Sequence, residues 1–201
     1  MAAIGLLGGT FDPIHIGHLI MAESARDALA LERIEFVPTH IPPHKADELV
    51  TPECDRVAML RAAIDGVREF SVNEIELARP GRSYTVDTLD RLTAERPDDS
   101  FWFIVGSDSL RDLVNWREPA RIIDLARIAV VPRPGVDVDI EALVTRLPNL
   151  RDRLCFVPAP FVDISSSRLR EMVRTGHSLR FQTPDAVIRY IDGHGLYRGR
   201  P

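Results

Sequence analysis

The sequence predicts an α/β fold in which a doubly wound parallel sheet is covered by helices on both faces. Two observations lead to this prediction. Short apolar runs alternate with amphipathic stretches along the chain, and Gly8-Gly9 forms a turn between the first apolar run and the first helical pattern. Alternating strands and helices favour a parallel sheet, in which each helix carries the chain back to the starting edge. Ligands of such sheets bind at the carboxyl ends of the strands.

Six apolar runs are predicted to be strands, and five amphipathic stretches are predicted to be helices. The strands are expected at 4–7, 34–38, 70–72, 101–105, 128–131 and 154–157, and the helices at 18–31, 52–64, 86–96, 118–126 and 139–147. A further helical region is expected from about 165 to 201. Because no repeat, low-complexity tract or long linker divides the 201 residues, we expect one Rossmann-like domain spanning 1–201.

Small hydroxyl residues precede three of the expected helices. Thr51 stands before a proline at a helix start, and either Ser83 or Thr85 could cap the third helix. The serines from Ser165 to Ser167 precede the last apolar-periodic stretch. The oxygen of such a side chain can accept a hydrogen bond from a free backbone N–H in the first turn. We therefore expect capped starts at all three positions.

Composition indicates a globular protein of the cytoplasm. Hydrophobic residues make up 45% and charged residues 27% of the chain, no apolar run reaches membrane-spanning length, and the first residues lack a signal-peptide pattern. The net charge of −5 argues against a nucleic-acid-binding surface. Cys54 and Cys155 lack metal-ligand spacing and are expected to be buried free thiols, with no disulfide or zinc site. The sequence leaves a homo-oligomer open.

The segment from Gly8 to His18 joins a glycine turn to two histidines. The glycines allow close approach of a ligand and a positive φ, and the following helix start offers free N–H groups and a positive dipole end. A spacing of three residues places His15 and His18 on one side of a helical turn, where both imidazoles can donate to phosphate oxygens. The segment therefore predicts a polyphosphate site, and two ordinary histidines beside a tight turn are the alternative.

Lys45 is the only lysine among the 25 basic residues, and it follows His44 in a proline-containing loop. Because the other 24 basic residues are arginines, a single lysine in this loop suggests that a compact ammonium group is needed near phosphate. Chance survival of one lysine is the alternative.

Two separated motifs carry a family resemblance. Gly9 to His18 reads Gly-x-Phe-x-Pro-x-His-x-Gly-His and resembles the signature of the HxGH nucleotidyltransferase superfamily. Ile164 to Arg170 resembles the superfamily's Ile-Ser-Ser-Thr-x-x-Arg motif, with Ser167 in place of threonine. Class I aminoacyl-tRNA synthetases share HxGH, but they are longer and carry a KMSKS-like loop that this sequence lacks.

From Gly5 to about Arg198, the chain resembles the bacterial nicotinate-nucleotide adenylyltransferases, which make deamido-NAD from ATP and nicotinate mononucleotide. The resemblance implies Mg²⁺ carried by the ATP phosphates, with no metal site formed by the protein. It implies an ATP site formed by Gly8, Gly9, Thr10, Phe11, His15, His18, Gly106, Asp108, Ile164, Ser166, Ser167 and Arg170. The nicotinate mononucleotide site would comprise His44, Lys45, Tyr84, Thr85, Trp116 and Arg133. The catalytic residues would be His15, His18, Lys45 and Arg170.

Other acceptors and another class of function stay open at this stage. Nicotinamide mononucleotide differs from the acid by one functional group, whose recognition the sequence does not show. Phosphopantetheine adenylyltransferases share the fold but usually carry threonine in place of the first histidine, and cytidylyltransferases use CTP. A nucleotide-binding regulatory module without catalysis is the alternative of another class, and the intact His15, His18, Asp108, Ser167 and Arg170 argue against it.

Overall fold

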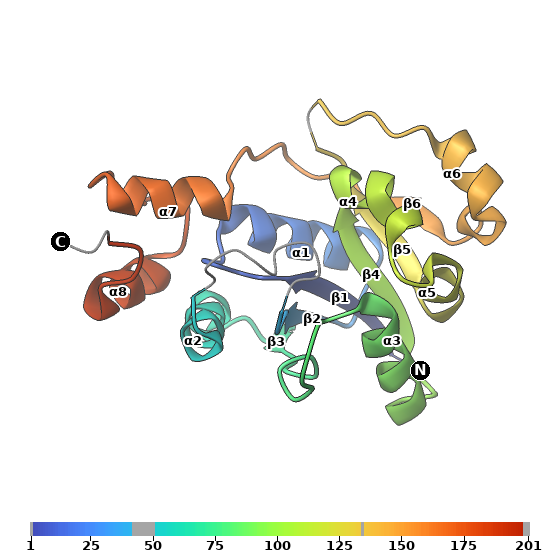
Figure 1. Ribbon diagram of the computed structural model, residues 1–201, viewed down its shortest axis with the longest axis horizontal. Helices are drawn as coiled ribbons and strands as arrows, with labels where there is room; N and C mark the ends of the chain where they lie inside the picture. The colour runs from blue at the N-terminus through green and yellow to red at the C-terminus, as the bar shows by residue number, and fades with distance from the viewer. Residues whose placement is uncertain (1, 42–50, 134, 199–201) are drawn as a thin grey trace.

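A single parallel sheet of six strands forms the centre of the computed structural model, which describes residues 2–41, 51–133 and 135–198 (Figure 1). The strand order is β3-β2-β1-β4-β5-β6, and every neighbouring pair is parallel. The strands are β1 (Ala3–Gly9), β2 (Arg33–Pro38), β3 (Phe70–Val72), β4 (Ser100–Gly106), β5 (Arg127–Val131) and β6 (Leu154–Phe156). All six predicted strands and the predicted fold class are confirmed.

Helices follow the strands in the alternation that the sequence predicts. They are α1 (Ile16–Ala28), α2 (Glu53–Ile64), α3 (Thr85–Glu95), α4 (Ser107–Asp112), α5 (Pro119–Leu125), α6 (Ile140–Arg146), α7 (Ser166–Arg174) and α8 (Asp185–His194). Two short 3₁₀ turns, η1 (Leu113–Asn115) and η2 (Pro148–Leu150), complete the set. Among the described residues, no helix is long and apolar enough to cross a membrane.

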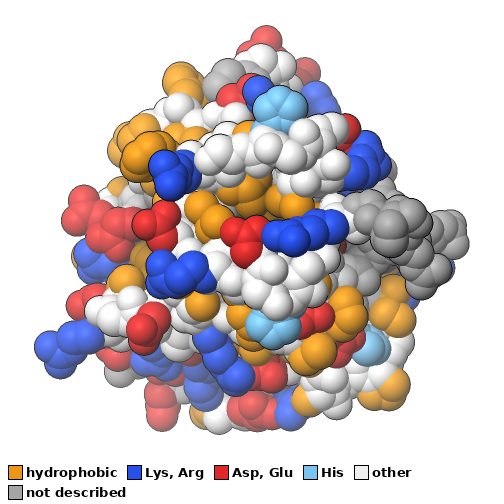
Figure 2. Space-filling model, turned by 90° about the vertical axis from the view of Figure 1, so that its left-hand side faces the viewer, with side chains coloured by type: hydrophobic (Ala, Val, Ile, Leu, Met, Phe, Trp, Pro, Cys, Tyr) orange, Lys and Arg blue, Asp and Glu red, His pale blue; other side chains and the backbone are white. Residues whose placement is uncertain are grey.

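The two faces of the sheet are covered by different helices. Along β1, Leu7 packs into one core with side chains of α1, α2, α7 and α8, whereas Ile4 and Leu6 pack into another with α3, α4, α5 and α6. This division follows from the two-residue period of a strand, which sends alternate side chains to opposite faces. The strand order reverses between β1 and β4, so a crevice is expected at the carboxyl ends of these two strands. In Figure 1, β1 runs toward the left and β4 runs upward to α4, and Figure 2 faces the left-hand side of that view.

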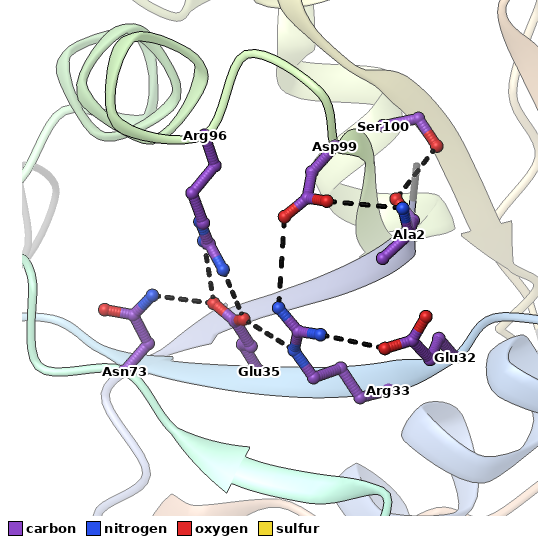
Figure 3. A network of polar contacts seen from close by, with 8 residues as sticks. All are labelled: Ala2, Glu32, Arg33, Glu35, Asn73, Arg96, Asp99 and Ser100. Atoms are coloured by element: carbon purple, nitrogen blue, oxygen red, sulfur yellow. Dashed lines mark hydrogen bonds and ion pairs between the residues drawn. The ribbon is translucent and has the colours of Figure 1, made fainter.

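A buried carboxylate secures the opposite edge of the sheet, at the amino ends of the strands (Figure 3). Glu35 on β2 is 5% exposed and accepts hydrogen bonds from Arg96 NH1 and NH2 at 2.6 and 3.0 Å, from Arg33 Nε at 3.1 Å and from Asn73 Nδ2 at 2.7 Å. Burial alone would raise the pKa of Glu35, but the hydrogen bonds from Arg96 and Asn73 outweigh it and hold the pKa below its usual value. This network joins β2, the turn after β3 and the end of α3.

Two of the three cap predictions are wrong. Thr51 does not cap α2, whose N-cap is the proline that follows it, and the N-cap of α3 is Tyr84; neither helix start has a side-chain cap. Ser83 Oγ instead accepts a hydrogen bond from the backbone N–H of His40 at 3.0 Å, and Thr85 is already the first residue of the helix. A hydrogen bond to a distant segment therefore uses the Ser83 hydroxyl, which the local pattern assigned to a helix cap.

The expected burial of the two cysteines is also wrong. Cys54 is exposed in the first turn of α2, and Cys155 is half-buried in β6. The second cysteine is less covered than a central-strand residue because β6 pairs with one neighbour and forms the edge of the sheet.

Replacing Glu35 by glutamine is expected to lower the free energy of unfolding by about 3 kcal/mol at pH 7, because it leaves two arginines without their buried anion. The pKa of Glu35 is lower in the folded than in the unfolded chain, so its contribution is present above pH 4.5 and is lost as the pH falls through the folded-state pKa. Urea unfolding at pH 7 and pH 3 measures both effects. The control Glu23→Gln breaks an exposed pair with Arg26 and should cost less than about 1 kcal/mol.

Candidate active site

Two cavities open at the carboxyl edge of the sheet. The first, of about 370 Å³, lies between the ends of β1 and β2 and the start of α3, and the second, of about 350 Å³, lies between the start of α1, the end of β5 and residues 160–165. The face shown in Figure 2 is hollowed, with hydrophobic side chains inside the hollow and charged side chains beside it. The cavities of about 370 Å³ and 350 Å³ are called the first and second cavities, respectively.

The two histidines lie together at the start of α1. His15 is the N-cap residue, and its ring stacks on His18 with 3.7 Å between centroids. The backbone N–H of His15 donates to His18 Nδ1 at 3.2 Å. Because Nδ1 accepts this bond, the proton of a neutral His18 is on Nε2. His15 lines the second cavity, whereas His18 lines neither cavity in the ligand-free protein. The predicted placement of both imidazoles on one side of the turn is confirmed.

Burial keeps both imidazoles neutral. It lowers the pKa of His15 to about 4, with a further contribution from the positive charge of Arg133. It also lowers the pKa of His18 well below its usual value, assisted by His15 and Arg133. At neutral pH the pair therefore offers uncharged N–H donors.

Buried polar atoms on the second cavity lack partners. Among the described residues, His15 Nδ1 and Asp108 Oδ1 are buried without a hydrogen bond, and both residues line this cavity. The other carboxylate oxygen of Asp108 pairs with Arg133 NH1 at 3.2 Å. A Cβ on Gly106 would lie 2.5 Å from Asp108 Oδ1 and 2.8 Å from Arg133 Nε, so any larger residue here would displace these two side chains. Since an unpaired buried polar atom is unfavourable, the cavity is suited to a ligand with hydroxyl or N–H groups.

The first cavity brings together three residues that the sequence assigned to one site. Tyr84, Thr85 and Trp116 all line it, and the Trp116 ring packs edge-on against Phe103 with 5.9 Å between centroids. Glu76, which the sequence analysis missed, also lines this cavity. Burial raises the pKa of Glu76, whose Oε1 accepts a hydrogen bond from Thr88 Oγ1 at 2.7 Å.

Several residues lie on a different cavity from their expected partners. Gly8, Gly9 and Thr10, expected in the ATP site, line the first cavity with Tyr84 and Trp116 because β1 ends against it. Arg133, expected in the acceptor site, lines the second cavity beside Asp108. Short-range patterns predicted that these residues lie at the carboxyl edge of the sheet. Which of the two cavities each residue lines depends on the strand order.

The turn after β1 differs from its prediction. Phe11, not Gly8 or Gly9, has the positive φ, at 50°. Its buried ring packs edge-on against His18, with 5.1 Å between centroids, and this packing supports a backbone conformation that costs about 1–3 kcal/mol outside glycine. A Cβ on Gly9 would lie 3.1 Å from the Phe11 ring, so a larger residue there would require the ring to shift by a few tenths of an ångström.

Residues of the motif from Ile164 to Arg170 bind the backbone of residues 10–15, the loop that leads to the two histidines and is called the histidine loop. Ser166 Oγ donates to Pro13 O at 2.9 Å, and Arg170 NH1 donates to Asp12 O at 2.7 Å. Arg170 NH2 also donates to Ser167 Oγ at 3.4 Å. These three motif residues do not line either cavity. In the ligand-free protein they orient the loop that carries the histidines.

The serine that caps α7 lies on the second cavity itself. Ser165 Oγ accepts a hydrogen bond from Arg168 N–H at 3.3 Å, which confirms the third cap prediction. Ile164 lines the same cavity, as does the exposed Phe161, which the sequence analysis did not single out. The predicted site residues His44 and Lys45 lie outside the described residues.

Arg56 is the most deeply buried charged residue in the described part of the chain, and the sequence analysis missed it. It is 1% exposed, and it donates to Thr10 O at 2.7 Å, Thr39 O at 2.8 Å and Thr51 O at 3.1 Å. The available signal was an arginine followed directly by the apolar residues of α2.

Among the described residues, no group of three His, Cys, Asp or Glu side chains is placed to hold a metal ion.

Comparison with known proteins identifies the family. A family model described as cytidylyltransferase-like matches residues 6–172. A protein of Thermomicrobium roseum is 45% identical over 198 residues, covering 98% of this chain and 92% of its own, and one of a Roseiflexus species is 48% identical over 197 residues, covering 98% of both. Both carry the name "probable nicotinate-nucleotide adenylyltransferase". The chain belongs to the nicotinate-nucleotide adenylyltransferase family. The resemblance stated from the motifs is thereby confirmed.

The fold of this adenylyltransferase family member is also found among distant solved structures. The nicotinic acid mononucleotide adenylyltransferase of Plasmodium falciparum, solved in complex with NaAD, superposes with a TM-score of 0.82 and covers 98% of each chain. At 20% identity, this likeness concerns the fold.

The protonation state of the histidine pair can be measured directly. We expect the His15 ring resonances in NMR spectra to titrate with a midpoint near pH 4 and to stay constant between pH 6 and 8, because burial disfavours the imidazolium. Spectra of His15→Gln assign the signal. A midpoint above pH 6 would contradict the buried, neutral pair.

Proposed function

We propose that this protein transfers the adenylyl group of ATP to nicotinate mononucleotide in the cytoplasm, giving deamido-NAD and pyrophosphate. The observation that carries the proposal is the pair of cavities on either side of the loop that bears His15 and His18. Two nucleotides can approach one phosphate-binding point from two sides, as a transfer between them requires. The names of the relatives supply the identities of the two substrates.

The second cavity suits the adenosine part of ATP. Asp108 Oδ1 is a buried acceptor without a partner among the described residues, and a ribose hydroxyl supplies a donor for it. Gly106 leaves room for this approach. The ATP phosphates would then extend toward His15, His18 and the start of α7, where free N–H groups and the positive helix end favour anions.

The first cavity suits the pyridine part of the acceptor. Trp116 and Tyr84 provide aromatic surface for the ring, and Thr85 provides a hydroxyl and a backbone N–H at the start of α3 for an exocyclic carboxylate. We extend this site to His44 and Lys45 on the family resemblance, as groups that order the phosphates. Arg133 is better suited to the nucleotide in the second cavity than to the acceptor, because it lies beside Asp108.

In the proposed reaction, an oxygen of the acceptor's 5′-phosphate attacks the α-phosphorus of ATP in line with the leaving pyrophosphate. A P–O bond forms to the acceptor as the bond to pyrophosphate breaks, so no protein nucleophile is needed. His15 and His18 hold the α-phosphate and stabilise the charge that develops on it, and Arg170 and Lys45 assist. Mg²⁺ enters with the ATP phosphates, since magnesium commonly binds through substrate phosphates and water.

Pyrophosphate release from the purified protein tests this function. ATP and Mg²⁺ are supplied with nicotinate mononucleotide, nicotinamide mononucleotide or phosphopantetheine, and CTP replaces ATP in a parallel series. We expect turnover with ATP and nicotinate mononucleotide. Nucleotide binding without turnover for any acceptor would instead favour the regulatory module.

His18→Ala is expected to lower kcat about 100-fold or more in the pyrophosphate assay, because it removes a preorganised donor to the reacting phosphate. His177→Ala is the matched control, because His177 is an exposed histidine whose ring pairs with the Thr175 hydroxyl and not with the histidine pair at the start of α1. Circular dichroism checks that both variants fold. A kcat for His18→Ala within a few-fold of the parent would remove His18 from the reaction.

Trp116→Ala is expected to weaken binding of nicotinate mononucleotide by about 10-fold, the loss of one stacking contact, while ATP binding changes little. Isothermal titration with each nucleotide measures the two affinities. Trp102→Phe is the control, because Trp102 is the other tryptophan and lines neither cavity. Equal weakening of ATP and acceptor would contradict the assignment of the first cavity.

A further inference from the structure

We propose that Tyr197 is a positioning residue of the active site, whose hydroxyl holds Asp12 and thereby the loop that leads to His15 and His18. The Tyr197 hydroxyl donates to Asp12 Oδ1 at 2.6 Å, across 185 residues of sequence. The effect of Tyr197 on adenylyl transfer rests on the proposed function. The effect of Tyr197 on the loop can be tested without any substrate.

Asp12 is buried within the phosphate-binding signature. It is 3% exposed, and within the described part of the chain each carboxylate oxygen has one hydrogen-bond donor: the Tyr197 hydroxyl on Oδ1 and the Thr51 backbone N–H on Oδ2, the latter at 3.2 Å. Burial, and then the hydrogen bond to Asp12, raises the pKa of Tyr197, so the phenol stays protonated. A buried carboxylate with two donors is held in one orientation, because losing either donor leaves an oxygen unsatisfied.

Cations hold the same short segment from other directions. Arg170 NH1 donates to the backbone carbonyl of Asp12 at 2.7 Å and lies 4.0 Å from its Oδ2. The buried guanidinium of Arg56 donates to Thr10 O at 2.7 Å. Burial lowers the pKa of Arg56, and the negative charge of Asp12 opposes this effect. Arg170 and Arg56 thus place positive charge near Asp12, and Tyr197 sets the orientation of its carboxylate.

The backbone of Tyr197 supports a specific role for this contact. Its φ of 62° is in the left-handed region, which costs about 1–3 kcal/mol for a non-glycine residue. Gly195, two residues earlier, has the same φ, which costs a glycine little. The chain thus turns sharply after α8 and delivers the phenol to Asp12, and the contacts of the side chain compensate for the unfavourable backbone conformation.

The consequence for chemistry follows from the position of Asp12, three residues before His15. His15 N–H donates to His18 Nδ1, so the backbone at His15 also sets the orientation of the His18 ring. Loss of one donor to Asp12 would allow the carboxylate to rotate and the loop to shift. Displacement of a catalytic group by about 1 Å can reduce a rate by about 100-fold. Tyr197 thus acts through the loop without touching the substrate.

Tyr190 provides a matched control within the same C-terminal region. Its hydroxyl donates to Asp55 Oδ1 on α2 at 2.9 Å, so this tyrosine also joins the C-terminal region to an aspartate. Unlike Tyr197, it makes no hydrogen bond to the histidine loop among the described residues. If the two hydroxyls only fasten the C-terminal region, their removal should have equal effects on activity.

The test compares Tyr197→Phe with Tyr190→Phe, each of which removes one hydroxyl. In the pyrophosphate assay we expect Tyr197→Phe to lower kcat by about 10-fold or more with the KM for the acceptor changed less than about 3-fold, and Tyr190→Phe to leave kcat within about 2-fold. Thermal unfolding measures the loss of stability in both variants. Equal kcat values for the two variants, or a kcat for Tyr197→Phe within 2-fold of the parent, would overturn the proposal.

NMR of the histidine rings separates this proposal from the proposed function. We expect the His15 and His18 ring signals to shift or broaden in Tyr197→Phe and to remain unchanged in Tyr190→Phe, without any substrate present. Unchanged signals in Tyr197→Phe would overturn the positioning role even if the parent protein is an active adenylyltransferase. An inactive parent whose signals respond as expected would overturn the proposed function and retain the link from Tyr197 to the loop.

Discussion

Hydrogen bonds to the backbone carbonyls of one short loop organise the functional edge of this protein. Thr10 O, Asp12 O, Pro13 O and Ile14 O each accept a bond from a side chain of a distant segment. The donors are Arg56, Arg170, Ser166 and Thr183, in that order. These four bonds hold the loop from Thr10 to Ile14, after which α1 begins with His15 on the second cavity. Three of the four donors belong to the C-terminal third of the chain, which thus supports the loop that leads to His15 and His18.

The two edges of the sheet differ in whether their buried polar groups have hydrogen-bond partners. At the amino edge, Glu35 is fully engaged by arginine and asparagine donors, which suits a purely structural network. At the carboxyl edge, His15 Nδ1 and Asp108 Oδ1 have no partners among the described residues. The first arrangement stabilises the fold, and the second retains hydrogen-bonding capacity for a ligand.

Electrostatics around the histidines favour an anionic ligand. Burial and the charge of Arg133 keep His15 and His18 neutral in the free protein, so they require no counter-ion while the site is empty. An arriving phosphate brings negative charge close to two N–H donors, the start of α1 and Arg133. Its charge is balanced by groups already oriented for it, which limits the reorganisation needed when charge develops in a transition state.

The sequence by itself determined the strands, the succession of helices and the two motifs, because each depends on a short-range pattern. Apolar runs specified β1 to β6, the spacing of His15 and His18 placed both rings on one side of α1, and Ser165 capped α7 as expected. These features arise from contacts within about four residues, which periodicity and capping rules describe.

Only the tertiary structure decided which groups meet across long separations. It placed Gly8, Gly9 and Thr10 on the first cavity and Arg133 on the second, assigned Ser83 to His40 rather than to a helix cap, and joined Tyr197 to Asp12. Each outcome depends on strand order or on packing between distant segments. A hydrogen bond across 185 residues leaves no periodic signal in a single sequence, because its free energy becomes available only after the intervening chain has folded.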